Sequence, residues 1–165
     1  MHIHHKAYVY LTCRNDLLVF EEPDNPEIGL QVPGGTLDPG ESFLLGARRE
    51  FAEETGLHLD MAVDHLCDED YFVAPQARAT GNTNEPQRPV TGCHRRRMFH
   101  AKIRSKPAEE WEHFEMTPSF GGEPIRFRLF WLDLKSRTAT ADDAFYMGFG
   151  ALLPALKARL AEAGQ

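Results

Sequence analysis

Short apolar runs separated by turn-forming residues dominate the start of the chain. Residues 7–12 (AYVYLT) and 17–21 (LLVFE) form two such runs, and Arg14, Asn15 and Asp16 lie between them. Runs of this length, rich in β-branched and aromatic residues, are typical of buried strands, so the pair predicts a hairpin. Residues 30–32 predict a further short strand that delivers the chain into a glycine turn.

Between residues 41 and 55 the pattern changes to helical spacing. The segment has no proline, one glycine and mostly good helix formers, so it predicts a helix. Leu44, Ala47 and Phe51 recur at i, i+3 and i+7 and predict an apolar stripe that packs on the core. Gly56 follows directly and fits the left-handed residue that closes a helix.

Downstream, the pattern predicts three more strands and a terminal helix. The strands cover residues 70–74, 95–103 and 125–134, and leucines spaced by four predict an amphipathic helix over residues 152–160. Residues 75–90 have no periodicity and predict a long surface loop. With no repeat or linker, we expect a single domain over residues 1–165, built as an α/β fold with a mixed sheet packed between helices.

Three glutamates share one face of the predicted helix. Glu50, Glu53 and Glu54 lie at i, i+3 and i+4, where like charges repel, and they crowd the helix end at which the dipole favours cations. A hard divalent cation would reverse both penalties. The alternative is a solvated acidic face. Gly34 and Gly35, just before the helix, let another group approach the backbone closely.

The segment from Gly35 to Leu57 fits the spacing G-x5-E-x7-R-E-U-x-E-E-x-G-U, in which U is a bulky apolar residue. The nine positions are filled by Gly35, Glu41, Arg49, Glu50, Phe51, Glu53, Glu54, Gly56 and Leu57. This pattern resembles the Nudix box. The resemblance implies a Nudix-type α/β/α sandwich with a mixed central sheet.

The same resemblance implies a metal-dependent pyrophosphohydrolase. Its substrate would be a nucleoside diphosphate linked to another group, or a nucleoside triphosphate, cleaved at the diphosphate bridge. The alternative is a catalytically silent Nudix-fold domain that binds a nucleotide as a sensor, for which a degraded box would be expected.

The resemblance assigns roles to the box residues. Glu50, Glu53 and Glu54 would hold one or more Mg²⁺ or Mn²⁺ ions, joined by the backbone carbonyl of Gly34 or Gly35. Arg49 would orient the carboxylates by ion pairing, and Glu41 would support the ions from outside or through water. The general base stays open among Glu50, Glu53 and the acidic residues of the segment 109–115.

Two other segments are predicted to bind the substrate. Arg95 and Arg97 belong to the chain's only basic cluster, which favours phosphate binding, with an exposed strand start as the alternative. Trp111 and Phe114, in the connection 106–122, are predicted to stack on a nucleobase, with ordinary core packing as the alternative. We therefore expect specificity to reside in residues 75–97 and 106–122.

The composition limits the classes of partner that we expect. Asp and Glu number 25 against 18 Lys and Arg, which gives a formal net charge of −7 at pH 7 and disfavours nucleic acid. The three cysteines lack CxxC spacing, so neither a disulfide framework nor a zinc site is expected. Without a signal peptide or an apolar run of about 18 residues, we expect a cytoplasmic protein with no membrane contact. The expected partner is a small-molecule nucleotide, and a homodimer is left open.

Overall fold

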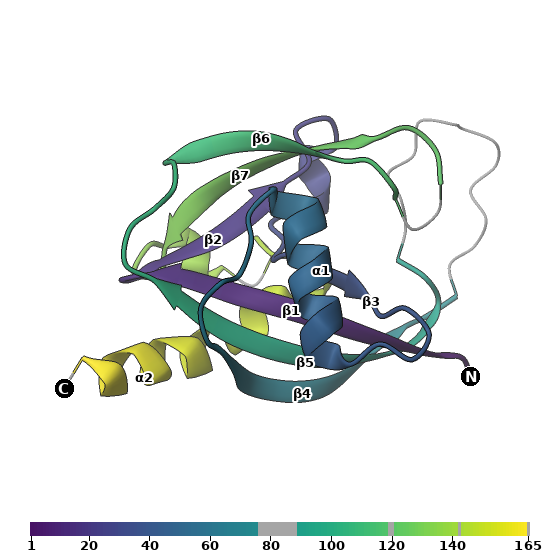
Figure 1. Ribbon diagram of the computed structural model, residues 1–165, viewed down its shortest axis with the longest axis horizontal. Helices are drawn as coiled ribbons and strands as arrows, with labels where there is room; N and C mark the ends of the chain where they lie inside the picture. The colour runs from purple at the N-terminus through teal and green to yellow at the C-terminus, as the bar shows by residue number, and fades with distance from the viewer. Residues whose placement is uncertain (76–88, 119–120, 142, 165) are drawn as a thin grey trace.

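The computed structural model describes residues 1–75, 89–118, 121–141 and 143–164. Seven strands form one mixed sheet (Figure 1) in the order β4-β5-β1-β2-β7-β6, with β3 paired to β1. β1 and β5 run parallel, and the other strand pairs are antiparallel. The strands are β1 (Ile3–Cys13), β2 (Asp16–Glu21), β3 (Gly34–Thr36), β4 (Val63–Val73), β5 (Gly92–Ile103), β6 (Glu110–Glu115) and β7 (Ile125–Asp133).

Helices cover both faces of the sheet. Ala7 and Val9 of β1 belong to the apolar cluster that packs under α1 (Phe43–Thr55), whereas Tyr8 and Tyr10 belong to the opposite cluster. That second cluster packs against the 3₁₀ helix η3 (Tyr146–Leu152) and α2 (Leu153–Ala163). Two short 3₁₀ helices, η1 (Pro26–Ile28) and η2 (Thr138–Thr140), lie in connections. The predicted α/β/α sandwich with a mixed sheet is confirmed.

The predicted hairpin is present, but its two strands separate soon after the turn. β1 pairs with β2 only at Thr12 and Cys13, while β2 pairs with β7 along its whole length. Residues 6–8 of β1, which β2 leaves unpaired, pair with β3 instead. The sheet therefore opens between β1 and β2, and the glycine-rich β3 lies at that opening.

The glycine pair forms this strand itself and is not the predicted turn. A Cβ atom on Gly34 would lie 2.2 Å from the carbonyl oxygen of Ala7, so only glycine lets the two backbones approach this closely. The predicted strand over residues 30–32 is reduced to single bridges made by Leu30 and Gln31.

The helix differs from prediction at its first turn. α1 begins at Phe43, and Ser42 caps it by accepting a hydrogen bond from the Leu45 N–H at 3.2 Å. Leu44 is 39% exposed, so it is not part of the buried stripe. Phe43 packs against the core in its place, because its spacing of four from Ala47 keeps it on the inner face. Gly56 closes the helix with φ 75°, as predicted.

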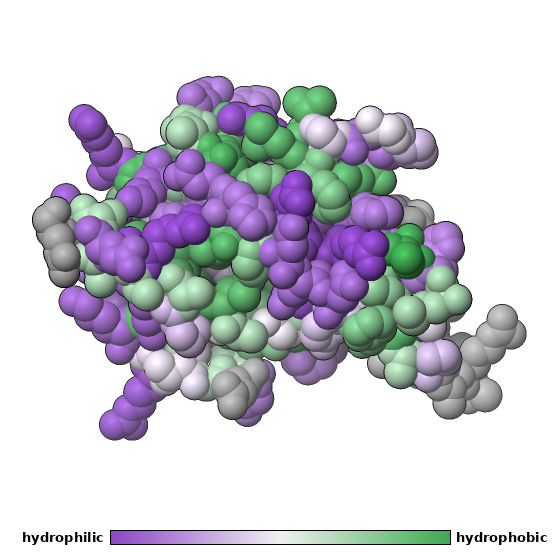
Figure 2. All heavy atoms as spheres, turned by 90° about the horizontal axis from the view of Figure 1, so that it is seen from below, coloured by the Kyte–Doolittle hydropathy of each residue, from purple (hydrophilic) through white to green (hydrophobic). Residues whose placement is uncertain are grey.

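β4 is longer than the predicted strand at residues 70–74, because its acidic residues pair across the strand with arginines of β5. Asp68, Glu69 and Asp70 lie opposite Arg97, Arg96 and Arg95. We call this set the acid–arginine ladder. Its side of the molecule, seen from below in Figure 2, carries mostly hydrophilic residues with smaller apolar areas between them.

Two other predictions concern connections. The connection predicted over residues 106–122 contains the strand β6. Most of the loop predicted over residues 75–90 lies outside the described residues. Among the described residues, no helix is long and apolar enough to cross a membrane.

Candidate active site

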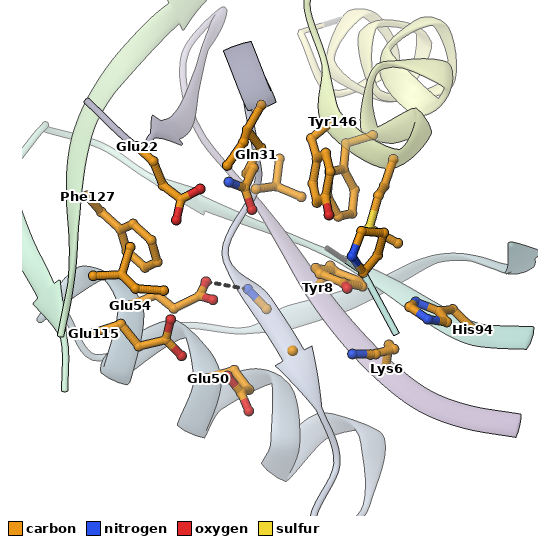
Figure 3. Close-up of a pocket in the computed structure, with 18 of the residues that line it drawn as sticks. Lys6, Tyr8, Glu22, Gln31, Glu50, Glu54, His94, Glu115, Phe127 and Tyr146 are labelled. Carbon is orange, nitrogen blue, oxygen red and sulfur yellow. Dashed lines mark hydrogen bonds between the residues drawn. The ribbon is translucent and has the colours of Figure 1, made fainter. Parts of the chain in front are cut away.

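A pocket lies where β1 and β2 separate (Figure 3). The side chains labelled there come from β1, α1, β5, β6, β7 and the start of η3, and from the connection between β2 and β3. Its lining includes Lys6, Tyr8, Glu22, Gln31, Gly34, Gly35, Glu50, Glu54, His94, Glu115, Phe127 and Tyr146. Glu50, Glu54 and Glu115 form one wall of the pocket, and Lys6, Tyr8, His94 and Tyr146 lie on the other side.

Glu54 is the most deeply buried acid of this wall. It is 7% exposed, and its Oε2 accepts a hydrogen bond from the Gly34 N–H at 2.9 Å. Burial raises the pKa of its carboxyl well above the usual value, and the charges of Glu50 and Glu115 raise it further. The Gly34 hydrogen bond offsets only part of that cost, so a cation near Glu54 would be strongly stabilised.

Glu50 lies one turn earlier, between β3 and Arg49. A Cβ atom on Gly35 would lie 2.5 Å from Glu50 Oε2, so glycine at this position leaves room for the carboxylate. Burial raises the pKa of Glu50, although Arg49 donates a hydrogen bond to its Oε1 at 2.8 Å. The other carboxylate oxygen of Glu50, Oε2, faces the backbone of Gly35.

Glu115 completes the acidic wall from the end of β6. Burial, followed by the charges of Glu50 and Glu53, raises its pKa to about 7. Of the acids in the segment 109–115 that were left open as general bases, it is the one that lines the pocket.

Arg49 gathers the remaining box acids outside the pocket. Its guanidinium makes paired hydrogen bonds with Glu41 at 2.9 Å each, and it lies 3.4 Å from Glu53 Oε2. These contacts lower the pKa of Glu41. Glu53 does not line the pocket, but it lines an adjoining cleft together with Glu50 and Glu115. The ion pairs place Arg49 against Glu41, Glu50 and Glu53, and its orienting role stays a prediction.

The acidic wall fits a divalent cation by the chemistry of its donors. It offers hard carboxylate oxygens, which Mg²⁺ and Mn²⁺ prefer, and the charge of Glu50 adds to burial in raising the pKa of Glu54 and of Glu115. As they stand, no three His, Cys, Asp or Glu side chains in the described ranges form a group that could hold a metal ion. Binding would therefore require Glu50 to turn from Arg49, or backbone oxygens to join the carboxylates.

The opposite wall carries two basic side chains. Lys6 donates a hydrogen bond to Thr36 Oγ1 at 2.7 Å, and burial lowers its pKa while Glu50 and Glu54 oppose that change. His94 is 1% exposed, and its Nε2 lies 2.6 Å from the Val90 carbonyl. The buried His94 Nδ1 has no hydrogen-bond partner among the described residues.

The predicted phosphate-binding arginines do not reach this pocket. Arg95 and Arg97 form two-point hydrogen bonds with Asp70 and Asp68, at 2.8–3.2 Å. Arg96, between them, points inward: it is 1% exposed, donates to the Met147 carbonyl at 2.9 Å and lies 4.2 Å from the Tyr71 ring. A role for Arg95 and Arg97 in phosphate binding stays a prediction that this geometry does not support.

The predicted stacking residues also lie outside the pocket. Trp111 packs beside α1 and donates from Nε1 to the Thr55 carbonyl at 2.9 Å, which is the core-packing alternative. Phe114 is 47% exposed. Neither ring belongs to the pocket lining, so the geometry does not support their predicted role in base stacking.

Besides the box residues, the pocket is lined by residues that belong to no motif. Lys6 directly precedes the buried run of β1, and Glu22 follows the last residue of β2. A charged residue at the border of a buried strand is the available signal in each case. Tyr146 had no comparable signal, because η3 reaches the pocket only through the tertiary fold.

Comparison with known proteins agrees with this geometry. A family model described as NUDIX domain matches residues 3–119. Among curated proteins, none matches the chain significantly. A NUDIX hydrolase from Nitrosomonas europaea is similar in structure, with a TM-score of 0.60, 19% identity and coverage of 99% of this chain and 90% of that one.

Two further solved structures are similar. The MutT protein from Bacillus halodurans has a TM-score of 0.57 at 15% identity, over 92% of this chain and 80% of its own. A bifunctional NMN adenylyltransferase/ADP ribose pyrophosphatase from Francisella tularensis, complexed with AMP and a Mn ion, has a TM-score of 0.54 at 15% identity. It is matched over 98% of this chain and 42% of its own. With the box intact and the family model matching most of its length, the chain belongs to the Nudix hydrolase family.

Proposed function

We propose that the chain is a metal-dependent pyrophosphohydrolase that cleaves the diphosphate bridge of a nucleoside diphosphate derivative or a nucleoside triphosphate. One observation carries the proposal: Glu50, Glu54 and Glu115 converge on one wall of a pocket, and each has a raised pKa. Carboxylates that raise one another's pKa destabilise the empty site and favour a cation between them.

Mg²⁺ or Mn²⁺ is the proposed cofactor, with Glu50, Glu53 and Glu54 as its side-chain ligands and Gly34 or Gly35 as a backbone ligand. The Mn ion and AMP bound by the Francisella tularensis neighbour support this choice. When bound, such a cation supplies charge neutralisation at the phosphate oxygens and lowers the pKa of an attacking water.

The protein groups divide the remaining work between the two walls. Glu115 is the proposed general base, because it lines the pocket beside Glu50 and a pKa near neutrality suits proton acceptance from water. Lys6 is proposed to contact a phosphate from the opposite wall, since a lysine ammonium binds phosphate as a point charge. Arg49 holds Glu41 and Glu53 in place through its ion pairs.

A substrate panel tests this function. Purified protein is incubated with nucleoside di- and triphosphates and with diphosphate-linked nucleosides, in Mg²⁺, Mn²⁺ or EDTA, and the released phosphate species are identified. We expect turnover that requires the cation and is lost in Glu54→Gln. Nucleotide binding without turnover under every condition would instead identify a silent nucleotide-binding domain.

A further inference from the structure

Glu22 is a fourth acid of the pocket lining, beside Glu50, Glu54 and Glu115, and its charge contributes to the raised pKa of Glu115. It follows the last residue of β2 and is 8% exposed. Figure 3 shows its carboxyl group pointing into the pocket. The proposed metal site does not use it, so its position needs a separate explanation.

Within the described residues, the Glu22 carboxyl has no hydrogen bond or ion pair. The neighbouring Glu21 differs, because it accepts a hydrogen bond from Arg128 Nε at 2.9 Å. Burial raises the pKa of Glu22, and the charges of Glu27 and Asp24 add to that effect. Its side chain lines the open pocket, so the carboxyl oxygens are free to accept hydrogen bonds from a ligand that enters there.

The groups around Glu22 suit a flat ring. Phe127 and Tyr146 line the same pocket, and Gln31 presents an amide there. Backbone hydrogen bonds at 2.9 Å tie these segments together: Gln31 to Phe20, and Tyr146 to Leu30. Phe127 also packs against Phe20, with ring centroids 4.4 Å apart. The pocket end is therefore organised before a ligand arrives.

We propose that Glu22 determines base specificity by accepting hydrogen bonds from two adjacent N–H groups on the edge of a guanine-type ring. A carboxylate only accepts hydrogen bonds, so it favours an edge with two neighbouring donors. Guanine presents such a pair in N1–H and the 2-amino group. Adenine and cytosine place an acceptor beside their amino group, and uracil has one N–H between two acceptors.

This inference rests on the proposed function, because the acidic wall fixes which end of the nucleotide carries phosphate. The test therefore uses nucleoside monophosphates, which contain no anhydride bond and report binding without hydrolysis. Guanosine and inosine monophosphates form a matched pair that differs only in the 2-amino group.

Binding of both monophosphates is measured by calorimetry in Mn²⁺ for the wild type, Glu22→Gln and Glu27→Gln. The wild type should bind guanosine monophosphate at least about ten-fold more tightly than inosine monophosphate, because a hydrogen bond to a charged group is lost with the amino group. Glu22→Gln should reduce this ratio below about three-fold. Glu27→Gln removes an exposed charge nearby and should keep the wild-type ratio.

Three outcomes would overturn the inference: equal wild-type affinity for the two ligands, an unchanged ratio in Glu22→Gln, or tightest binding of adenosine monophosphate. Thermal melting of Glu22→Gln at or above the wild-type temperature shows that the variant is folded. Pterins carry the same edge, so tighter binding of neopterin monophosphate than of guanosine monophosphate would identify a pterin as the source. Failure of the hydrolysis assay would refute the proposed function and leave the binding ratios unaffected.

Discussion

Two acidic clusters of this chain differ in the charges that surround them. In the acid–arginine ladder, Asp68, Glu69 and Asp70 of β4 each lie across from an arginine of β5. Hydrogen bonds from Arg97 and Arg95 lower the pKa of Asp68 and of Asp70. On α1, Arg49 alone serves several acids, and the pKa values of Glu50 and Glu54 are raised. The number of acids is similar, so burial and the number of paired arginines distinguish the two clusters.

The difference separates structural charge from functional charge. An acid paired with an arginine is stabilised within the folded protein. Removing such an acid should change the stability of the protein and not its binding of a ligand. An uncompensated acid destabilises the fold until a ligand supplies the opposite charge. The ladder therefore pairs its charges at an edge of the sheet, whereas the acidic wall of the pocket is where we propose that a cation binds.

The two clusters should differ most in how a substitution affects enzymatic activity. Glu54→Gln is expected to lower kcat/KM by at least about a hundred-fold, because several kcal/mol of charge stabilisation depend on the cation. Asp68→Asn removes one charge from the ladder and should stay within about two-fold of the wild type. Steady-state assays at saturating Mn²⁺ measure both. An equal loss in the two variants would mean that the clusters do not differ in function.

Metal binding should discriminate between the clusters through stability. Mn²⁺ at a hundred times its Kd should stabilise the wild type by about 2.7 kcal/mol, and the doubly substituted Glu50→Gln, Glu54→Gln protein should gain nothing. Asp68→Asn should retain the full shift. Thermal melts in EDTA and in Mn²⁺ measure these changes. A Mn²⁺ shift in the double variant as large as in the wild type would rule out this pair as ligands.

The pH dependence of stability should have opposite signs in the two clusters. Burial raises the pKa of Glu115 from 4.5 to about 7 in the folded protein. Its contribution to stability is therefore fully present below pH 4.5 and is lost as pH rises through 7. In EDTA, Glu115→Gln should remove that loss and gain about 1–3 kcal/mol over the wild type at pH 8.

Urea unfolding of both proteins at pH 4 and pH 8 measures this gain. Glu109→Gln is the control, since Glu109 is an exposed acid outside the pocket lining. The same gain at pH 4 would mean that packing, and not ionisation of Glu115, explains the difference.

The box itself is predictable from sequence because its chemistry is local. Helical spacing places the glutamates together, and the cap at Gly56 follows from its residue type. The glycine pair forms a strand and not the turn that its residue types predict, because its pairing with Ala7 and Tyr8 depends on a strand about 27 residues earlier. Such long-range pairing leaves no signal in the segment itself.

The substrate residues were harder to predict for the same reason. A basic cluster in an acidic chain suggests phosphate binding, but the decisive fact is the register that sets Arg95 and Arg97 against Asp70 and Asp68. Register is a tertiary property. The pocket likewise combines Lys6, Glu22 and Tyr146, which are far apart in sequence and share no spacing.

The ladder should yield the smallest effect, and its pH dependence is the informative part. Because the Asp68 pKa is lowered, its contribution is present above pH 3.8 and is lost as pH falls through the folded value. Asp68→Asn should therefore cost about 1 kcal/mol or less at pH 7, since both side chains are half exposed and solvent screens the pair. Urea unfolding at pH 7 and pH 2.5 should show the difference shrinking in acid, and 1 M salt at pH 7 should shrink it too.

Arg97→Met is measured in the same unfolding experiments. It also tests the phosphate-binding role that the sequence predicts for this arginine. Its stability should follow that of Asp68→Asn, apart from the packing of Arg97 on Phe43, whose ring centroid lies 4.8 Å away. Its kcat/KM should stay near the wild type, because Arg97 is outside the pocket lining. A fall of about ten-fold or more, corresponding to about 1.4 kcal/mol, would show that the arginine leaves Asp68 to bind substrate, and the ladder would then belong to the site.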